Sequence, residues 1–174
     1  MGQLIIVLLR LAVPVSILRW PLAGGLFSML LDALDVVLIE MIGQGGFEHY
    51  AALDKGLDTY YLAFEVFVSL RWEPIARWTS VGLFAYRAVG VVAFEATQTR
   101  ALLLVFPNLF ENFYVFYLVL RRVAPAYILT PRNLAMWLTL LLIPKLAQEY
   151  LLHYAEAQPW DWIKRNVLRD AWQF

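Results

Sequence analysis

The sequence has no cysteine and only two histidines, His49 and His153. Without cysteine there is no disulfide, thiol nucleophile or cysteine-ligated metal site. Cysteine usage therefore does not indicate whether the protein works in an oxidising or a reducing compartment. Two histidines this far apart are too few for a haem or chlorophyll system, and each is interpreted as an interfacial residue. Charge is also scarce: 14 basic and 14 acidic residues give a formal net charge of zero, which argues against a nucleic-acid partner.

Apolar residues take the place of the missing charge. Of the 174 residues, 61% are hydrophobic and 16% are charged, and the mean hydropathy is +0.62. Soluble domains have about 45–50% apolar and about 25% charged residues. This excess is too large for one buried core, so we predict an integral membrane protein, located in the plasma membrane of a prokaryote.

The apolar residues fall into segments of the length that crosses a bilayer, which is roughly 20 residues for a helix. The predicted fold is all-α: a polytopic membrane protein in one domain, 1–174, with six transmembrane helices and a C-terminal interfacial helix within 159–174. The six helices are expected at 3–19, bent near Pro14, and at 22–43, 55–72, 75–97, 100–122 and 132–155. Pro21, Pro74 and Pro131 lie near helix starts, where a missing N–H costs least. Because Arg10 interrupts the first apolar run and no basic segment precedes it, 3–19 is expected to be a retained helix rather than a signal peptide.

Several charged residues lie inside these predicted spans, where each costs about 2.5–3.5 kcal/mol on insertion scales. They are Asp32, Asp35, Glu40, Glu65, Arg87, Glu95, Glu111, Lys145 and Glu149. Lys145 and Glu149 have the i, i+4 spacing of a helical ion pair. For the residues outside the aspartate pairs, ion pairing within the helical bundle is the preferred interpretation over catalysis.

The aspartates form two pairs with helical spacing. Asp32 and Asp35 are i, i+3, and Asp54 and Asp58 are i, i+4, so each pair shares a helix face. A short glycine-rich turn between them predicts antiparallel neighbouring helices, and only Lys55 offers a basic partner nearby. Four close carboxylates repel unless they are protonated or bind cations, and an all-oxygen site suits Mg²⁺, Mn²⁺ or Ca²⁺. The alternative is that Asp54 caps a helix and Asp58 faces water, which leaves Asp32 and Asp35 unexplained.

The segments "DALDVVLIE" (32–40) and "DKGLD" (54–58) resemble the motif of the CDP-alcohol phosphotransferases. These are six-helix membrane enzymes with the pattern D-x-x-D-G-x-x-A-R, eight residues, G-x-x-x-D-x-x-x-D. The resemblance implies phospholipid synthesis from a CDP-alcohol and an acceptor alcohol. It also implies that the four aspartates, Asp32, Asp35, Asp54 and Asp58, hold one or two Mg²⁺ or Mn²⁺ ions, and that Asp58 is the base that activates the acceptor.

The sequence departs from that motif at the residues that contact the nucleotide in the family. Val36 replaces the glycine, Ile39 the alanine and Glu40 the arginine, and the second aspartate pair comes one residue late. The resemblance therefore supports the fold and the metal ligands better than the substrate.

Three functions stay open at the level of sequence. The first is a divergent phosphotransferase of this type. The second is a non-catalytic membrane scaffold or complex subunit that retains the fold, with membrane lipid, a second copy or other membrane proteins as partners. The third, a small transporter that uses intramembrane carboxylates, is disfavoured because the sequence shows no inverted repeat.

Overall fold

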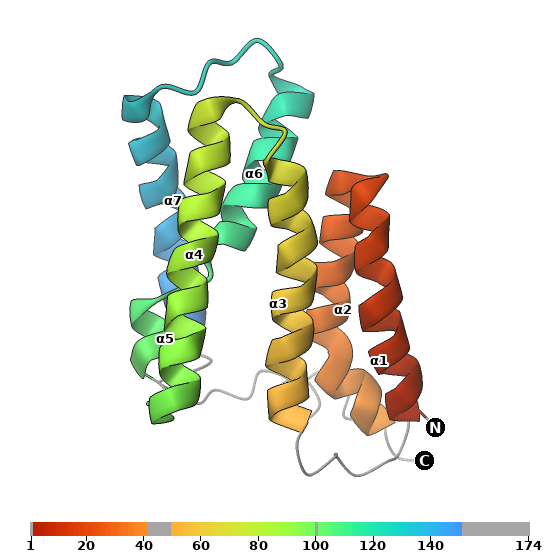
Figure 1. Cartoon of the computed structure of the whole chain (residues 1–174). Coiled ribbons are helices and arrows are strands. Elements are labelled where there is room, and N and C mark those ends of the chain that lie inside the picture. The colour runs from red at the N-terminus through yellow and green to blue at the C-terminus, as the bar shows by residue number, and fades with distance from the viewer. Residues whose placement is uncertain (1, 42–49, 100, 151–174) are drawn as a thin grey trace, which may run out of the picture.

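The computed structural model describes residues 2–41, 50–99 and 101–150, and every regular element in these ranges is a helix (Figure 1). In chain order they are α1 (Gly2–Ala12), the 3-10 helix η1 (Val13–Leu18), α2 (Pro21–Met41), α3 (Tyr50–Ser69), α4 (Pro74–Thr97), α5 (Ala101–Val105), α6 (Leu109–Val123) and α7 (Pro131–Glu149). Figure 1 shows α1, α2 and α3 side by side along one long axis, with α4, α5 and α7 beyond them and α6 behind. The predicted all-α class is confirmed for these residues.

Proline sets the start of three helices, as the sequence predicts. Pro21, Pro74 and Pro131 are the first residues of α2, α4 and α7. At the start of α7 the backbone N–H of Asn133 donates to Oγ1 of Thr130 over 3.4 Å, and the N–H of Thr130 donates to Oδ1 of Asn133 over 2.7 Å. This reciprocal capping satisfies two backbone donors that the helix itself leaves without partners.

Proline also breaks two of the predicted helices. The bend expected near Pro14 is a change from α1 to the tighter η1. The single helix predicted at 100–122 is wrong, because the chain is interrupted at 106–108, around Pro107. Proline has no N–H and disfavours helical backbone in the residue before it. Side chains of α4 bond the carbonyls beside the break: Arg87 Nη1 donates to O of Phe106 over 2.9 Å, and the Tyr86 hydroxyl to O of Val105 over 2.7 Å.

The remaining helix boundaries differ from the predicted ones by a few residues. α3 begins at Tyr50 rather than at 55 and ends at Ser69 rather than at 72. α7 is described to Glu149. The glycine-rich turn and the predicted interfacial helix within 159–174 lie outside the described residues.

Aromatic side chains of α6 form the centre of the bundle. Phe110, Phe113 and Tyr114 have no exposed surface, and Tyr117 is also buried. Trp72, just after α3, stacks on Tyr114 with ring centroids 5.4 Å apart and lies 4.2 Å from the ring of Tyr117. Such contacts add to the free energy of burying the rings. α6 also packs against α2, α4 and α7, so it joins the α2–α3 part of the bundle to the part formed by α4 and α7.

Two segments of the described chain are long and apolar enough to cross a membrane. They are Pro74–Thr97 and Ala101–Val123, with mean hydropathy 1.2 and 1.6. Only 17% and 39% of the residues in their apolar windows are buried, so much of this apolar surface faces outward. An outward apolar surface of this kind suits lipid contact. Length and apolarity therefore support two membrane-spanning segments among the described residues. They do not establish the predicted count of six transmembrane helices.

Two glycines of α4 provide a test of how closely α4 packs on the α5–α6 break. A Cβ added at Gly90 would lie 2.2 Å from Cβ of Phe106, whereas a Cβ at Gly82 would meet nothing within 4 Å. We expect Gly90→Ala to lower the free energy of unfolding by about 1–3 kcal/mol through overpacking. Gly82→Ala should be neutral or stabilise by up to about 1 kcal/mol, because alanine favours helix. Thermal unfolding in detergent compares the two, and equal midpoints would contradict the packing described.

Candidate functional site

Arg10 lies at the centre of the candidate site. Its side chain comes from the last turn of α1 and is 3% exposed. Its guanidinium donates to Asp32 and Asp35 of α2 and to Asp58 of α3, with 2.5 Å between Nη2 of Arg10 and Oδ1 of Asp32. We call these four side chains the Arg10 cluster. It joins three helices, because α2 presents two aspartates on one face and α3 runs beside that face.

The cluster contains three of the four predicted metal ligands. Asp32, Asp35 and Asp58 converge, as their spacing on neighbouring helices predicts. The side chain of Asp54 lies outside the described residues, as do those of Val36, Ile39 and Glu40, where the sequence departs from the phosphotransferase motif.

The expectation that only Lys55 offers these aspartates a basic partner is wrong. Arg10 is the partner of three of them, at sequence separations of 22, 25 and 48 residues. Helical spacing cannot reveal a partner on a distant helix. One signal was present in the sequence: a lone arginine in an apolar helix needs a paired acid when it enters the bilayer.

The donor atoms of the cluster suit a hard divalent ion, but their arrangement does not. Carboxylate oxygens are the ligands that Mg²⁺ and Mn²⁺ prefer. Here the Arg10 guanidinium takes one oxygen of each of the three carboxylates and occupies the space between them. Over the ranges that the structure covers, no group of three or more acidic or histidine side chains is arranged to hold a metal ion. As arranged, the cluster binds a guanidinium rather than a metal.

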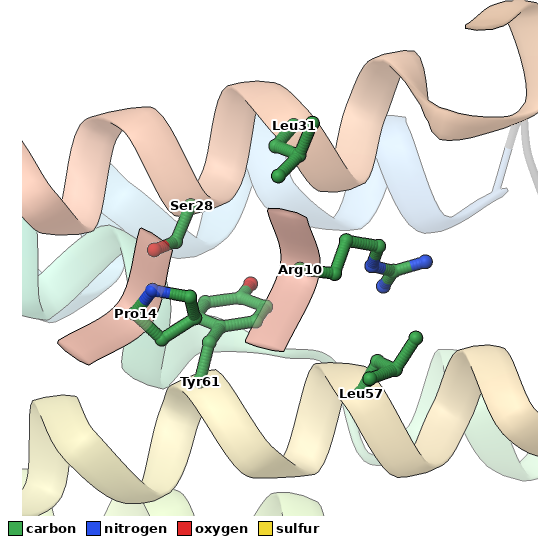
Figure 2. Close-up of a pocket in the computed structure, with 6 residues that line it drawn as sticks. All are labelled: Arg10, Pro14, Ser28, Leu31, Leu57 and Tyr61. Atoms are coloured by element: carbon green, nitrogen blue, oxygen red, sulfur yellow. The ribbon is translucent and has the colours of Figure 1, made fainter. Parts of the chain in front are cut away.

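A small cavity lies beside the cluster, between α1, η1, α2 and α3. Its volume is about 10 Å³, and Figure 2 shows Tyr61 entering it from α3 and Ser28 from α2, next to Pro14 and Arg10. This is close to the smallest space that holds one water molecule. Sites for drug-sized ligands measure about 300–1,000 Å³, so this cavity does not fit a nucleotide.

A second group of buried polar side chains joins α3, α6 and α7. The Tyr61 hydroxyl donates to Oε1 of Glu111 over 2.6 Å, and Nδ2 of Asn108 donates to Oε2 of Glu111 over 3.1 Å. Nζ of Lys145 lies 3.8 Å from Oε2 of Glu111 and 3.5 Å from Oε1 of Glu149. The predicted ion pair of Lys145 and Glu149 is confirmed. We call these five residues the Glu111 network.

Glu65 does not follow the prediction that the intramembrane charges pair within the bundle. Its side chain is 0% exposed, and neither carboxyl oxygen has a hydrogen-bond partner among the described residues. Gly25 of α2 provides the room, since a Cβ there would lie 3.0 Å from Oε1 of Glu65 and 2.9 Å from the Tyr114 ring. A buried polar group without a partner is rare and costly.

Comparison of the chain with protein-family models, curated proteins and solved structures gives no match. The likeness to the CDP-alcohol phosphotransferases therefore rests on the motif residues alone.

Proposed function

We propose that the chain is a non-catalytic integral membrane protein, a helical scaffold that works as a subunit of a membrane assembly. The observation that carries this proposal is the position of Arg10 between Asp32, Asp35 and Asp58. In this scaffold the Arg10 guanidinium holds the three carboxylates together. In a catalytic phosphotransferase a metal ion would occupy that position.

A guanidinium suits this task for physical reasons. Three close carboxylates repel one another, and arginine stays charged at any physiological pH. Its five N–H donors form a planar fork that bonds several oxygens at once. Because Arg10 is 4% exposed, water screens these bonds little, and they fix α1 against α2 and α3.

The proposed scaffold crosses the membrane six times, with both termini on one side. The six crossings are α1 with η1, α2, α3, α4, α5 with α6, and α7. In Figure 1 the start of α1 and the end of α7 lie towards the same end of the bundle, which supports this topology. The outward apolar surface of α4 and of α5 with α6 supports contact with lipid. The proposal adds a surface helix within 159–174. The partners of the scaffold would be membrane lipid and either a second copy of the chain or other membrane proteins. Its location would be the plasma membrane of a prokaryote.

A second candidate, the divergent CDP-alcohol phosphotransferase, is favoured by one observation: three of the four motif aspartates converge. In that function Asp32, Asp35, Asp54 and Asp58 would hold Mg²⁺ or Mn²⁺, and Asp58 would act on the acceptor alcohol. The arrangement described above does not fit a metal, so Arg10 would have to leave the cluster first.

A transfer assay separates the two functions. Purified protein is incubated with radiolabelled CDP-diacylglycerol, a panel of acceptor alcohols and Mg²⁺ or Mn²⁺. We expect no turnover above that of Asp58→Asn, because Arg10 already bonds Asp58. The control is the oligomeric state and thermal midpoint of both proteins, which should show that both are folded. Robust turnover that Asp58→Asn abolishes would establish the phosphotransferase and reject the scaffold.

A further inference from the structure

A polar seam runs between α2 and α3, from the Arg10 cluster into the middle of the bundle. Both helices contribute residues at spacings of three and four, so each set lies on one helix face. The seam consists of Gly25, Ser28 and Asp32 of α2 and Asp58, Tyr61 and Glu65 of α3. The pairing of the two faces is antiparallel: Arg10 bridges Asp32 and Asp58, Ser28 and Tyr61 line one cavity, and Gly25 lies against Glu65.

Glu65 forms the inner end of the seam and is the least satisfied polar group in it. It is 0% exposed, and both of its carboxyl oxygens lack a hydrogen-bond partner among the described residues. A buried carboxylate without a partner or cation is strongly unfavourable, whereas a neutral carboxylic acid costs far less. We propose that Glu65 is a proton-binding site within the bundle and that it exchanges its proton through the seam.

Among the described residues, the groups packed around Glu65 leave a proton as the means of neutralising it. α2 presents Gly25, which has no side chain to donate. From α6, the Tyr114 hydroxyl donates instead to O of Pro21 over 3.2 Å, and Glu111 adds a second acid close enough to act on Glu65. From α3 itself, the Tyr61 hydroxyl donates to Glu111.

Lys145, the cation of the Glu111 network, is already engaged. Nζ of Lys145 lies 3.8 Å from Glu111 and 3.5 Å from Glu149, and it donates to Oε1 of Gln148 over 3.1 Å. No described lysine or arginine forms an ion pair with Glu65.

Tyr61 is the group that relays the proton between the cavity and Glu65. It precedes Glu65 by one helical turn, and its ring borders the cavity that suits one water molecule. In the structure its hydroxyl donates to Glu111, so the step begins when that hydroxyl turns from Glu111 to Glu65. The hydroxyl then gives its proton to the Glu65 carboxylate and takes one from a hydronium ion in the cavity, so that the balance is one proton from solvent to Glu65, with neutral water left behind. This role does not depend on whether the Arg10 cluster holds a guanidinium or a metal.

Infrared spectroscopy of the full chain in lipid nanodiscs tests the site directly. At neutral pH, wild-type protein should show a protonated-carboxyl C=O band that shifts in D₂O. Glu65→Gln should lose this band, whereas Glu95→Gln, the same change at an exposed acid, should keep it. A wild-type spectrum without the band, or an unchanged band in Glu65→Gln, would overturn the proposal. A band that appears only when Na⁺ is removed would also overturn it, since the ligand would then be a metal cation.

Two further variants cover the route and the case in which Glu65→Gln does not fold. Tyr61→Phe should keep the band but slow its H/D exchange by about tenfold or more, because a positioned acid–base group is lost. Unchanged exchange would exclude Tyr61 from the route. Gly25→Ala keeps Glu65 but places a Cβ 3.0 Å from its Oε1, so the band should shift in frequency. A band that stays at the same frequency in Gly25→Ala does not arise from Glu65.

Discussion

Arg10→Met should destabilise the protein more than any other single substitution considered. Removing one partner from a buried ion-pair network costs about 3–5 kcal/mol, since the remaining charges lose their compensation inside the bundle. Here one guanidinium serves Asp32, Asp35 and Asp58, and Asp35 is itself 3% exposed. The measurement is chemical or thermal unfolding in a mild detergent, followed by circular dichroism.

Three comparisons test whether the loss comes from the cluster. Arg122→Met removes an exposed arginine and should change the free energy of unfolding by no more than about 0.5 kcal/mol. Arg10→Lys keeps the charge but not the fork, so its loss should be intermediate. Adding Asp35→Asn to Arg10→Met should recover part of the loss, which a double-mutant cycle measures as coupling. Equal losses for Arg10→Met and Arg122→Met would mean that the cluster does not hold the three helices together.

Helical periodicity predicted the local parts of the site correctly. It placed Asp32 and Asp35 on one face of α2, and it paired Lys145 with Glu149 on α7. Each of these predictions concerns residues within one helical turn, where backbone geometry alone fixes which side chains are neighbours. The proline rules were equally reliable for the starts of α2, α4 and α7.

Contacts between distant helices were not predictable in the same way. The bond from Arg10 to Asp58 spans 48 residues of sequence, and it depends on how α1 packs against α3. The break around Pro107 was missed because the flanking apolar residues extend the helical pattern across it. The isolation of Glu65 depends on Gly25 of another helix and on where the neighbouring tyrosine hydroxyls donate. Pro107 marks the break in the sequence, but the contacts of Arg10 and the isolation of Glu65 depend on packing between helices, which the spacing of residues along the chain does not give.

Added divalent metal should distinguish the wild-type protein from Arg10→Met. In the wild type the guanidinium lies where a shared metal ion would sit, so Mn²⁺ has no site to bind in the Arg10 cluster. In Arg10→Met the carboxylates lose this cation, and an oxygen-rich site for a hard ion is created. A ligand that binds only the folded state stabilises it by about 2.7 kcal/mol at 100 times its dissociation constant. Mn²⁺ should therefore restore much of the stability that the substitution removes.

The thermal midpoint of the two proteins, measured with and without millimolar Mn²⁺, tests most directly whether Arg10 stands in place of a metal. A matched series with a metal chelator in place of Mn²⁺ defines the metal-free baseline. The double variant Arg10→Met, Asp58→Asn controls for Mn²⁺ binding elsewhere on the chain. The scaffold predicts an unchanged midpoint for wild type and a raised midpoint for Arg10→Met, which the added Asp58→Asn reduces. A wild-type midpoint that rises with Mn²⁺, and no longer rises in wild type carrying Asp58→Asn alone, would contradict it.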